Sequence, residues 1–204
     1  MILYSILFVL LYIPFLIFYP TRVIGRKNLK GTRKKGIIFA VNHQSNADVV
    51  LCGLKIYRYQ RFTAKKELGK FFLIRWVIKG VGSFMVDRGK PNLELYKKGT
   101  ALLNDGKALT MFPEGTRKKI SSEDMLELKN GLAMFALKTN CLITPVFFEK
   151  KPRVFRPNRM HIGQPFKLEG FDKVNKENLA LATAQLSQKF DELKQQAATR
   201  RIKK

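Results

Sequence analysis

The chain contains few cysteines and few histidines. Cys52 and Cys141 lie in apolar runs far apart in the sequence, and neither spacing fits a metal site or a disulfide framework. A reducing compartment is the simplest interpretation. The two histidines, His43 and His161, are also far apart, without the spacing of metal ligands. The sequence therefore indicates no metal ion and no cofactor.

Acidic residues are scarce as well. Among 204 residues, 15 Asp and Glu face 39 Lys and Arg, so the net charge is 39 − 15 = +24. The hydrophobic content of 46% is typical of a globular chain, which excludes general disorder and allows one sizeable core. So large a positive charge indicates an anionic partner, either nucleic acid or a membrane surface.

Charge is absent from the first 20 residues, "MILYSILFVLLYIPFLIFYP". As a helix they would cover about 30 Å, roughly the hydrocarbon thickness of a bilayer. They lack the basic start and small-residue cleavage site of a signal peptide. The sequence therefore predicts a membrane anchor over residues 1–20. Pro14 leaves a kinked span and a shallow re-entrant hairpin both open.

Basic residues follow this apolar stretch, and the first acidic residue of the chain is Asp48. The positive-inside rule places the remaining chain on the cytoplasmic side. Cations at this position would also lie against anionic headgroups, at about 1 kcal/mol each. The basic residues between the stretch and residue 36 are Arg22, Arg26, Lys27, Lys30, Arg33, Lys34 and Lys35.

Apolar runs of strand length then alternate with windows that favour helix. Helices are predicted at 91–105, with Pro91 in the first turn and Gly106 just past the end, and at 130–140. This alternation predicts an α/β fold, a mostly parallel central sheet flanked by helices. The expected strands are 36–42, 61–65, 82–86, 108–112 and 142–148, with 159–166 as a further edge strand.

Past Lys173, apolar residues recur at three- and four-residue steps and form one stripe on a polar helix. We expect this stripe to cover the core, with membrane contact as the alternative. The predicted organisation is a membrane anchor (1–20), a catalytic domain (21–172), and a C-terminal amphipathic helix with a basic tail (173–204). The stripe consists of Leu179, Ala182, Leu186, Phe190 and Leu193.

A polar segment, "NHQSNAD", interrupts apolar sequence at residues 42–48. His43 falls at the carboxyl end of a predicted strand, where open α/β sheets bind ligands. Ser45 or Asn46 can cap the next helix, and a turn lets Asp48 fold back onto the imidazole. Such a pair forms a general base. Considered alone, the spacing is explained equally well by a capped turn with a satisfied histidine.

The proton that such a base removes belongs more plausibly to a substrate than to the enzyme. No G-x-S-x-G occurs, and both cysteines lie in apolar segments that suit inert thiols. A second polar segment, "MFPEGTR" (111–117), follows another predicted strand. Its glycine permits close backbone approach and its arginine offers a planar fork of donors, which is chemistry for a phosphate.

These segments resemble the sequence blocks of the glycerolipid acyltransferases, most closely the 1-acyl-sn-glycerol-3-phosphate acyltransferases. "NHQSNAD", "GSFMVDR" (82–88), "FPEGTR" (112–117) and "ITPV" (143–146) occur in the family's order. "TAKKEL" (63–68) and "LKNG" (128–131) are also similar to the family, as is the apolar N-terminus. The resemblance covers residues 20 to 170, and its first and third blocks are the specific ones.

The resemblance implies a role for each matching residue. His43 is the base and Asp48 its partner, and Arg88 matches the arginine of the second block. Either Lys65 or Lys66 matches a basic residue that helps to hold phosphate. Pro145 takes the fourth-block position, linked to the acyl donor, although a threonine precedes it where an apolar residue is commoner. The acceptor-phosphate site is formed by Glu114, Gly115, Thr116 and Arg117.

The expected function is acyl transfer from acyl-CoA or acyl-acyl carrier protein to the sn-2 hydroxyl of lysophosphatidic acid. The alternatives are a relative that uses glycerol-3-phosphate or another lysolipid, and, from a different class, a non-catalytic basic protein that binds membrane or nucleic acid. Nucleic-acid binding predicts interleaved aromatic and basic residues, whereas the phenylalanines here lie in apolar runs. We therefore expect no nucleic-acid partner.

Overall fold

The structure is a computed structural model that describes residues 2–86, 93–113, 130–171 and 173–202. Its centre is a seven-stranded sheet in the order β1-β7-β6-β2-β5-β3-β4. All neighbouring strands are parallel except β6 and β7, which are antiparallel. The strands are β1 (Thr21–Ile24), β2 (Ile37–Val41), β3 (Gln60–Lys65), β4 (Phe84–Val86), β5 (Ala108–Met111), β6 (Leu142–Phe148) and β7 (Asn158–Ile162).

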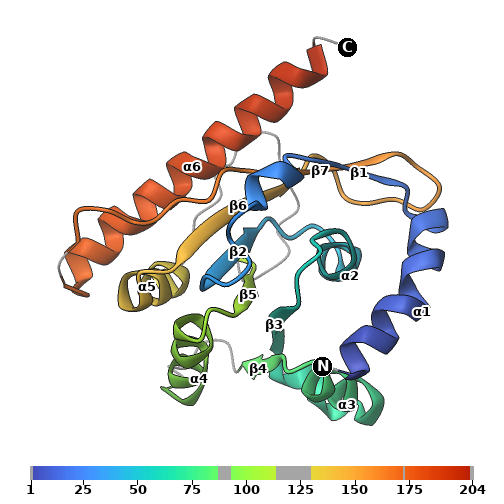
Figure 1. The fold of residues 1–204 in the computed structure, drawn as a ribbon, viewed down its shortest axis with the longest axis horizontal. Helices are drawn as coiled ribbons and strands as arrows, with labels where there is room; N and C mark the ends of the chain where they lie inside the picture. The colour runs from blue at the N-terminus through green and yellow to red at the C-terminus, as the bar shows by residue number, and fades with distance from the viewer. Residues whose placement is uncertain (1, 87–92, 114–129, 172, 203–204) are drawn as a thin grey trace.

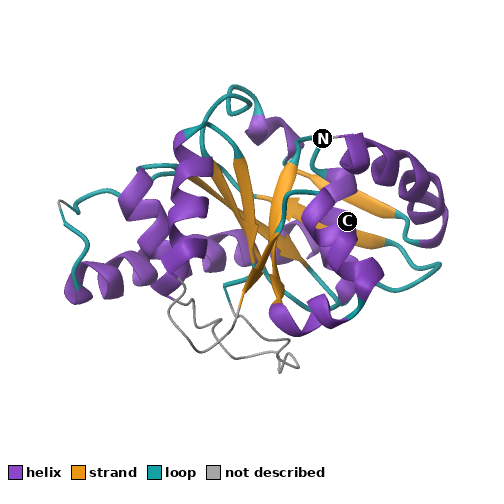
Figure 2. Cartoon of the chain, turned by 90° about the horizontal axis from the view of Figure 1, so that it is seen from below, coloured by secondary structure: helices purple, strands orange, loops and turns teal. Residues whose placement is uncertain are grey.

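Helices cover both faces of this sheet (Figures 1 and 2). One face buries a core shared with α4, α5 and α6, and the other buries a core shared with α2 and the end of α1. The predicted α/β class with a mostly parallel sheet is confirmed. The helices are α1 (Ile2–Phe18), α2 (Asn46–Lys55), α3 (Phe72–Gly80), α4 (Leu93–Asn104), α5 (Asn130–Thr139) and α6 (Lys176–Ile202), with 3₁₀ turns η1 (Arg26–Leu29) and η2 (Lys66–Lys70).

The sheet differs from the sequence prediction at one edge. β7 (Asn158–Ile162) overlaps the predicted strand at 159–166 but ends earlier. It is not an edge strand, because β1 pairs with its other side. β1 was not predicted at all. Its four residues follow directly on the apolar N-terminal segment. Thr21 and Arg22, the first two residues of the strand, are polar, so the sequence contains no apolar run of strand length here. The edge strands are therefore β1 and β4.

The turn after α4 shows why a glycine stands at position 106. Gly106 has φ of +69°, a left-handed conformation that disfavours other residues. A Cβ at this position would lie 2.4 Å from the carbonyl oxygen of Lys34. The chain can therefore leave the helix and enter β5 only with glycine here, as the sequence predicted for the end of this helix.

The C-terminal helix covers the core, as predicted. Ala182, Leu186 and Phe190 are buried in the cluster on the α4 and α5 face, and Leu179 packs against the same cluster. The apolar stripe of α6 thus packs against the core and is not exposed to solvent. Where the chain divides into domains stays a prediction.

The N-terminal segment forms one continuous helix, α1, with Pro14 inside it. Phe15 and Tyr19, at its end, pack against the core on the α2 face. In the part of the chain that the structure describes, no helix combines the length and the apolar character that a membrane crossing needs. Helix formation is observed, whereas anchoring of the protein by this helix stays a prediction.

Candidate active site

β2 delivers the polar segment to the carboxyl edge of the sheet. All five residues of β2, Ile37–Val41, are buried, so its position is fixed from both faces. Asn42 follows at the strand end, and its backbone N–H donates to the carbonyl of Val146 in β6. His43 is the next residue. It therefore starts from a rigid strand rather than from a loose loop.

His43 and Asp48 are in contact. Imidazole Nδ1 lies 3.2 Å from carboxylate Oδ2, with Asp48 completely buried and His43 nearly so. Ser45 is the N-cap of α2, and Asp48 lies in the first turn of this helix. The turn between the two residues brings the carboxylate back onto the ring, which is the arrangement predicted from their spacing.

The Asp48 carboxylate is held by several donors. Its Oδ2 accepts from the backbone N–H groups of Gln44, at 2.6 Å, and Ser45, at 2.7 Å. Its Oδ1 accepts from the Ser45 hydroxyl at 3.1 Å. These bonds compensate the burial of a negative charge. They also fix the carboxylate independently of the histidine, so Asp48 can orient the imidazole.

The tautomer of His43 follows from this partner. An ionised carboxylate only accepts hydrogen bonds, so we assign the proton of the neutral ring to Nδ1. Nε2 then carries the lone pair and is the basic nitrogen. The ring of Phe112 lies 4.3 Å from the imidazole, centroid to centroid, and limits the positions that the ring can take. The pair has the geometry of an oriented general base.

Sheet topology brings the other predicted segments to the same edge. β2, β5, β3 and β4 are consecutive and parallel, so their carboxyl ends share one side of the sheet. Phe112 and Pro113 follow β5, Lys65 ends β3, and residue 88 follows β4 by two positions. Four segments identified separately in the sequence therefore leave neighbouring strands at one edge.

Several predicted residues lie outside what the structure describes. Arg88 and the candidate phosphate-site residues Glu114, Gly115, Thr116 and Arg117 fall beyond the described ranges. Lys65 and Lys66 are described as the last residue of β3 and the first residue of η2, without their side chains. Their roles stay predictions. Pro145 lies within β6, opposite Ala40 of β2.

Both cysteine thiols are poor nucleophile candidates in this fold. Cys52 and Cys141 are buried. Burial raises the pKa of Cys52 well above its usual range, and the nearby Asp48 charge raises it further. Burial also raises the pKa of Cys141, to about 11. A protonated, buried thiol does not attack an acyl group, which supports direct attack by a substrate hydroxyl.

His161 forms a second, partly buried pair, with Glu149, at 2.6 Å between Nε2 and Oε1. It joins β7 to the residue that follows β6, and Arg159 lies 3.7 Å from the same carboxylate group. Across the described ranges, no group of three or more His, Cys, Asp or Glu side chains is placed to hold a metal ion. Metal-independent chemistry stays a prediction.

Two contacts of the site were not predicted. The Asn42 and Gln44 side chains both bond to the backbone of Phe148, and Phe112 packs on His43. The polar character of residues 42–46 was visible in the sequence, but the strand that they bond to lies 100 positions further along. A long-range pairing of this kind has no local signal.

The fold and the site together define an α/β enzyme with a buried histidine–aspartate base at the carboxyl edge of a mostly parallel sheet. Residues 21–149 match the family model described as Acyltransferase. The match covers more than half of the chain and includes both residues of the candidate base, His43 and Asp48. The chain belongs to this acyltransferase family.

Individual relatives agree with this assignment. The chain is similar to the 1-acyl-sn-glycerol-3-phosphate acyltransferase of Bacillus subtilis (strain 168), with 31% identity over 84% of this chain and 87% of that protein. The enzyme of the same name from Saccharomyces cerevisiae is 32% identical over 67% of this chain but only 45% of its own length. The chain thus spans most of the first relative and less than half of the second.

A solved structure has the same fold. The crystal structure of the 1-acyl-sn-glycerophosphate (LPA) acyltransferase PlsC from Thermotoga maritima superposes with a TM-score of 0.62. It covers 85% of this chain and 72% of that chain, at 24% sequence identity. The similarity supports the observed arrangement of sheet and helices.

Proposed function

We propose that this protein transfers a fatty acyl group from a thioester to the sn-2 hydroxyl of lysophosphatidic acid, which yields phosphatidic acid. The donor is acyl-CoA or acyl-acyl carrier protein. The observation that carries the proposal is the buried contact between His43 and Asp48 at the carboxyl edge of the sheet. The names of the Bacillus and yeast relatives support the choice of acceptor.

The reaction needs a base and a leaving group but no covalent enzyme intermediate. Nε2 of His43 takes the proton of the acceptor hydroxyl while its oxygen attacks the thioester carbonyl. The tetrahedral intermediate then collapses, the carbon–sulfur bond breaks, and the thiolate receives the proton from the imidazolium. Asp48 stabilises that imidazolium and holds the ring in place. The products are the new ester and the free thiol of the donor.

General-base assistance contributes about 10²–10⁴-fold, so the remaining acceleration comes from positioning and oxyanion stabilisation. Positioning requires that the acceptor be held by its phosphate. Arg117, within "EGTR", supplies a fork of donors suited to a phosphate. This segment starts two positions after Phe112 in the sequence, and Phe112 packs on His43; that sequence position supports the proposal.

We also propose that the protein acts at the cytoplasmic face of a membrane, held there by α1. Support comes from exposed aliphatic side chains on α1, including Val9, Leu10 and Ile13, and from the basic residues that follow it. Deletion of residues 1–20 should release much of the protein from isolated membranes. Retention of the truncated protein at high salt would locate the anchor elsewhere.

Acyl transfer by the purified full chain tests the proposal. Lysophosphatidic acid, glycerol-3-phosphate and lysophosphatidylcholine should each be combined with an acyl-CoA and with an acyl-acyl carrier protein. We expect the highest kcat/KM with lysophosphatidic acid. A preference for glycerol-3-phosphate or for an acceptor without a terminal phosphate would replace the proposed acceptor. Binding to anionic vesicles without any turnover would instead favour the alternative of a non-catalytic membrane-binding protein.

A further inference from the structure

α3 presents its large apolar side chains to the outside. Phe71, Phe72 and Leu73 are 63%, 68% and 71% exposed, and Trp76 is 56% exposed. Among the described residues of this helix, only Ile78 is buried. A helix on the surface of a water-soluble protein normally directs its apolar stripe toward the core. The reversed arrangement here marks a surface that is built for contact.

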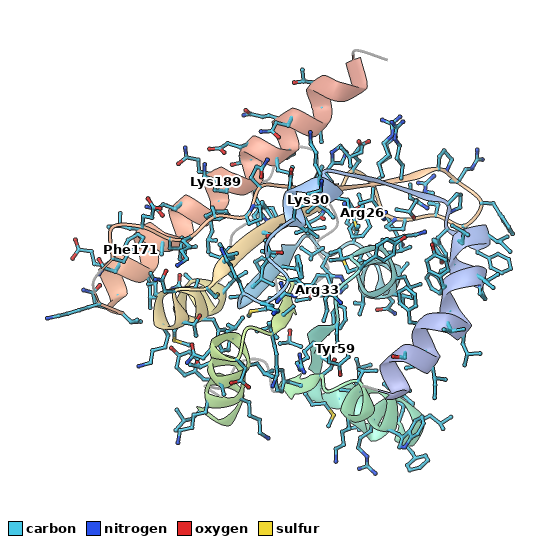
Figure 3. The ribbon with its side chains drawn as sticks, viewed as in Figure 1. Arg26, Lys30, Arg33, Tyr59, Phe171 and Lys189 are labelled. Atoms are coloured by element: carbon cyan, nitrogen blue, oxygen red, sulfur yellow. The ribbon has the colours of Figure 1, made fainter. Side chains whose placement is uncertain are left out.

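The exposed residues share one side of the helix. At about 100° per residue, Phe72, Trp76 and Leu73 cover an arc of roughly 100°. Ile78, which faces the sheet, lies on the opposite side. We define the α3 patch as Leu68, Phe71, Phe72, Leu73 and Trp76, all of which are at least 40% exposed. Figure 3 shows the side chains of α3 projecting away from the sheet at the lower right.

The charge along α3 has one sign. Between Glu67 and Asp87 the sequence contains no acidic residue, but it contains Lys70, Arg75 and Lys79. Arg75 and Lys79 follow Phe72 by three and seven positions and therefore lie beside it on the helix. Aromatic side chains flanked by cations are the combination that favours the interfacial region of an anionic bilayer.

The α3 patch adjoins a second exposed apolar surface. α1 contacts α3, and the N-terminal end of α1 lies next to α3 (Figure 1). α1 itself exposes Val9, Leu10 and Ile13. Two segments about 60 residues apart in the sequence thus place bulky apolar groups on neighbouring parts of the surface. A contact that extends over both helices suits a lipid surface.

We propose that the α3 patch inserts into the headgroup and upper acyl region of an anionic membrane, as a docking element separate from α1. The helix lies parallel to the membrane, with Phe72, Leu73 and Trp76 among the acyl chains and Lys70, Arg75 and Lys79 at the headgroups. The choice of a lipid partner follows from the single sign of the charge along α3. A second copy of the chain would bring like charges together at the same contact.

Trp76 is the only tryptophan of the chain, so the unmodified protein carries its own probe of this contact. The full chain is mixed with vesicles of phosphatidylcholine and phosphatidylglycerol, with and without bromine on the acyl chains. We expect a blue shift of Trp76 emission on binding, quenching by the brominated lipids, and protection from aqueous acrylamide. None of these readouts requires turnover, so they are independent of the proposed acyl transfer.

A double variant, Phe72→Gln with Leu73→Gln, keeps the tryptophan and should fold normally because both side chains are exposed. It should lose most of the quenching by brominated lipids and bind vesicles at least about tenfold more weakly. Leu181→Gln is the matched control, since Leu181 is an exposed leucine of α6, on the opposite side of the fold from α3. It should behave as the parent protein does.

Three results would overturn the proposal. The first is vesicle-bound protein in which Trp76 remains accessible to acrylamide and unquenched by brominated lipid. The second is an equal loss of binding in Leu181→Gln and in the double variant. The third is a blue shift that depends on protein concentration without lipid and is accompanied by the mass of a dimer, which would assign the α3 patch to self-association.

Discussion

Asn42 and Phe148 are joined by two hydrogen bonds between a side chain and a backbone. The Asn42 amide donates to the Phe148 carbonyl at 3.0 Å and accepts from the Phe148 N–H at 2.8 Å. These bonds continue the pairing of β2 with β6 just where β2 ends. Asn42, which precedes His43, is therefore held against the neighbouring strand β6. These bonds fix the start of the turn between His43 and Asp48.

Asn42→Ala should destabilise the protein by about 1–3 kcal/mol, because it leaves the buried N–H of Phe148 without its acceptor. We also expect lower kcat, because the backbone directly before His43 is then held less firmly against β6. Urea unfolding and initial-rate assays measure the two effects. Gln44→Ala is the control: the Gln44 side chain donates to the Phe148 carbonyl, and that carbonyl keeps its Asn42 donor. Equal losses of stability in both variants would contradict this account of Asn42.

His43→Ala should lower kcat by about 10²–10⁴ and leave the fold intact, because the general base is lost. His161→Gln provides a matched control. His161 is also buried and paired with a carboxylate, but it belongs to β7 and not to the turn that follows β2. Its replacement should lower the stability to urea and leave kcat of the folded enzyme nearly unchanged. Near-normal turnover of His43→Ala would refute the mechanism.

Asp48→Asn and Asp48→Ala separate orientation from charge. An amide oxygen can still accept from the Gln44 and Ser45 N–H groups, so the Asn variant should remain close to the parent in stability. It should nevertheless lose roughly 10²–10⁴-fold in kcat, because the imidazolium loses its counter-charge. The Ala variant also leaves two backbone donors unpaired and should unfold at lower urea concentration. If Asp48→Asn keeps full kcat, Asp48 serves only as a cap of α2.

The contact between His43 and Asp48 could be predicted because its determinants are local. Ser45 caps a helix, Asp48 falls in its first turn, and the turn returns the carboxylate to the ring. Six strands, β2 to β7, and the stripe of α6 were predictable for the same reason, since hydrophobic periodicity is a local signal. The neighbouring strand ends follow from the parallel order of the sheet.

Other features depend on partners that no local pattern reveals. β1 is only four residues long and exists because it pairs with β7, more than 130 positions away. The bonds of Asn42 to Phe148 span 106 positions. The outward orientation of the α3 side chains is likewise set by which side of the helix meets the sheet. The sequence shows an apolar stretch there, but not which of its residues stay exposed.

The thiols provide a test of the route without an acyl-enzyme. Because burial raises the pKa values of Cys52 and Cys141, both should react slowly with iodoacetamide at pH 8 in the folded protein and rapidly in urea. A variant with both cysteines replaced by alanine should retain most of the parent kcat. Rapid labelling that abolishes turnover in parallel would point to a thiol nucleophile instead.

The raised thiol pKa values also predict a direction for stability against pH. The folded state holds the thiol protons at pH values where unfolded thiols, with an ordinary pKa near 9, release them. The unfolded state then binds fewer protons, so stability falls as pH rises above this value. Urea midpoints between pH 7 and pH 10 should decline less in the double alanine variant. An equal decline in both proteins would show that other groups control the effect.

Arg117 offers the sharpest test of the acceptor site. If it binds the acceptor phosphate equally in the ground state and the transition state, Arg117→Ala should raise KM and change kcat comparatively little. The expected loss in kcat/KM for lysophosphatidic acid is roughly 1.5–3 kcal/mol, the strength of a hydrogen bond to a charged group. Arg117→Lys should recover only part of it, because lysine keeps the charge and loses the planar fork.

The control for Arg117 is an acceptor that lacks the phosphate, such as monoacylglycerol. The parent enzyme should use this acceptor poorly, because nothing else in the proposal holds it in position. Arg117→Ala should use it no worse than the parent does, since the group that the arginine binds is already missing. The two acceptors then show different losses for the same substitution. Equal damage to both would mean that Arg117 is structural or serves the acyl donor, and the assignment of residues 114–117 to the acceptor phosphate would fail.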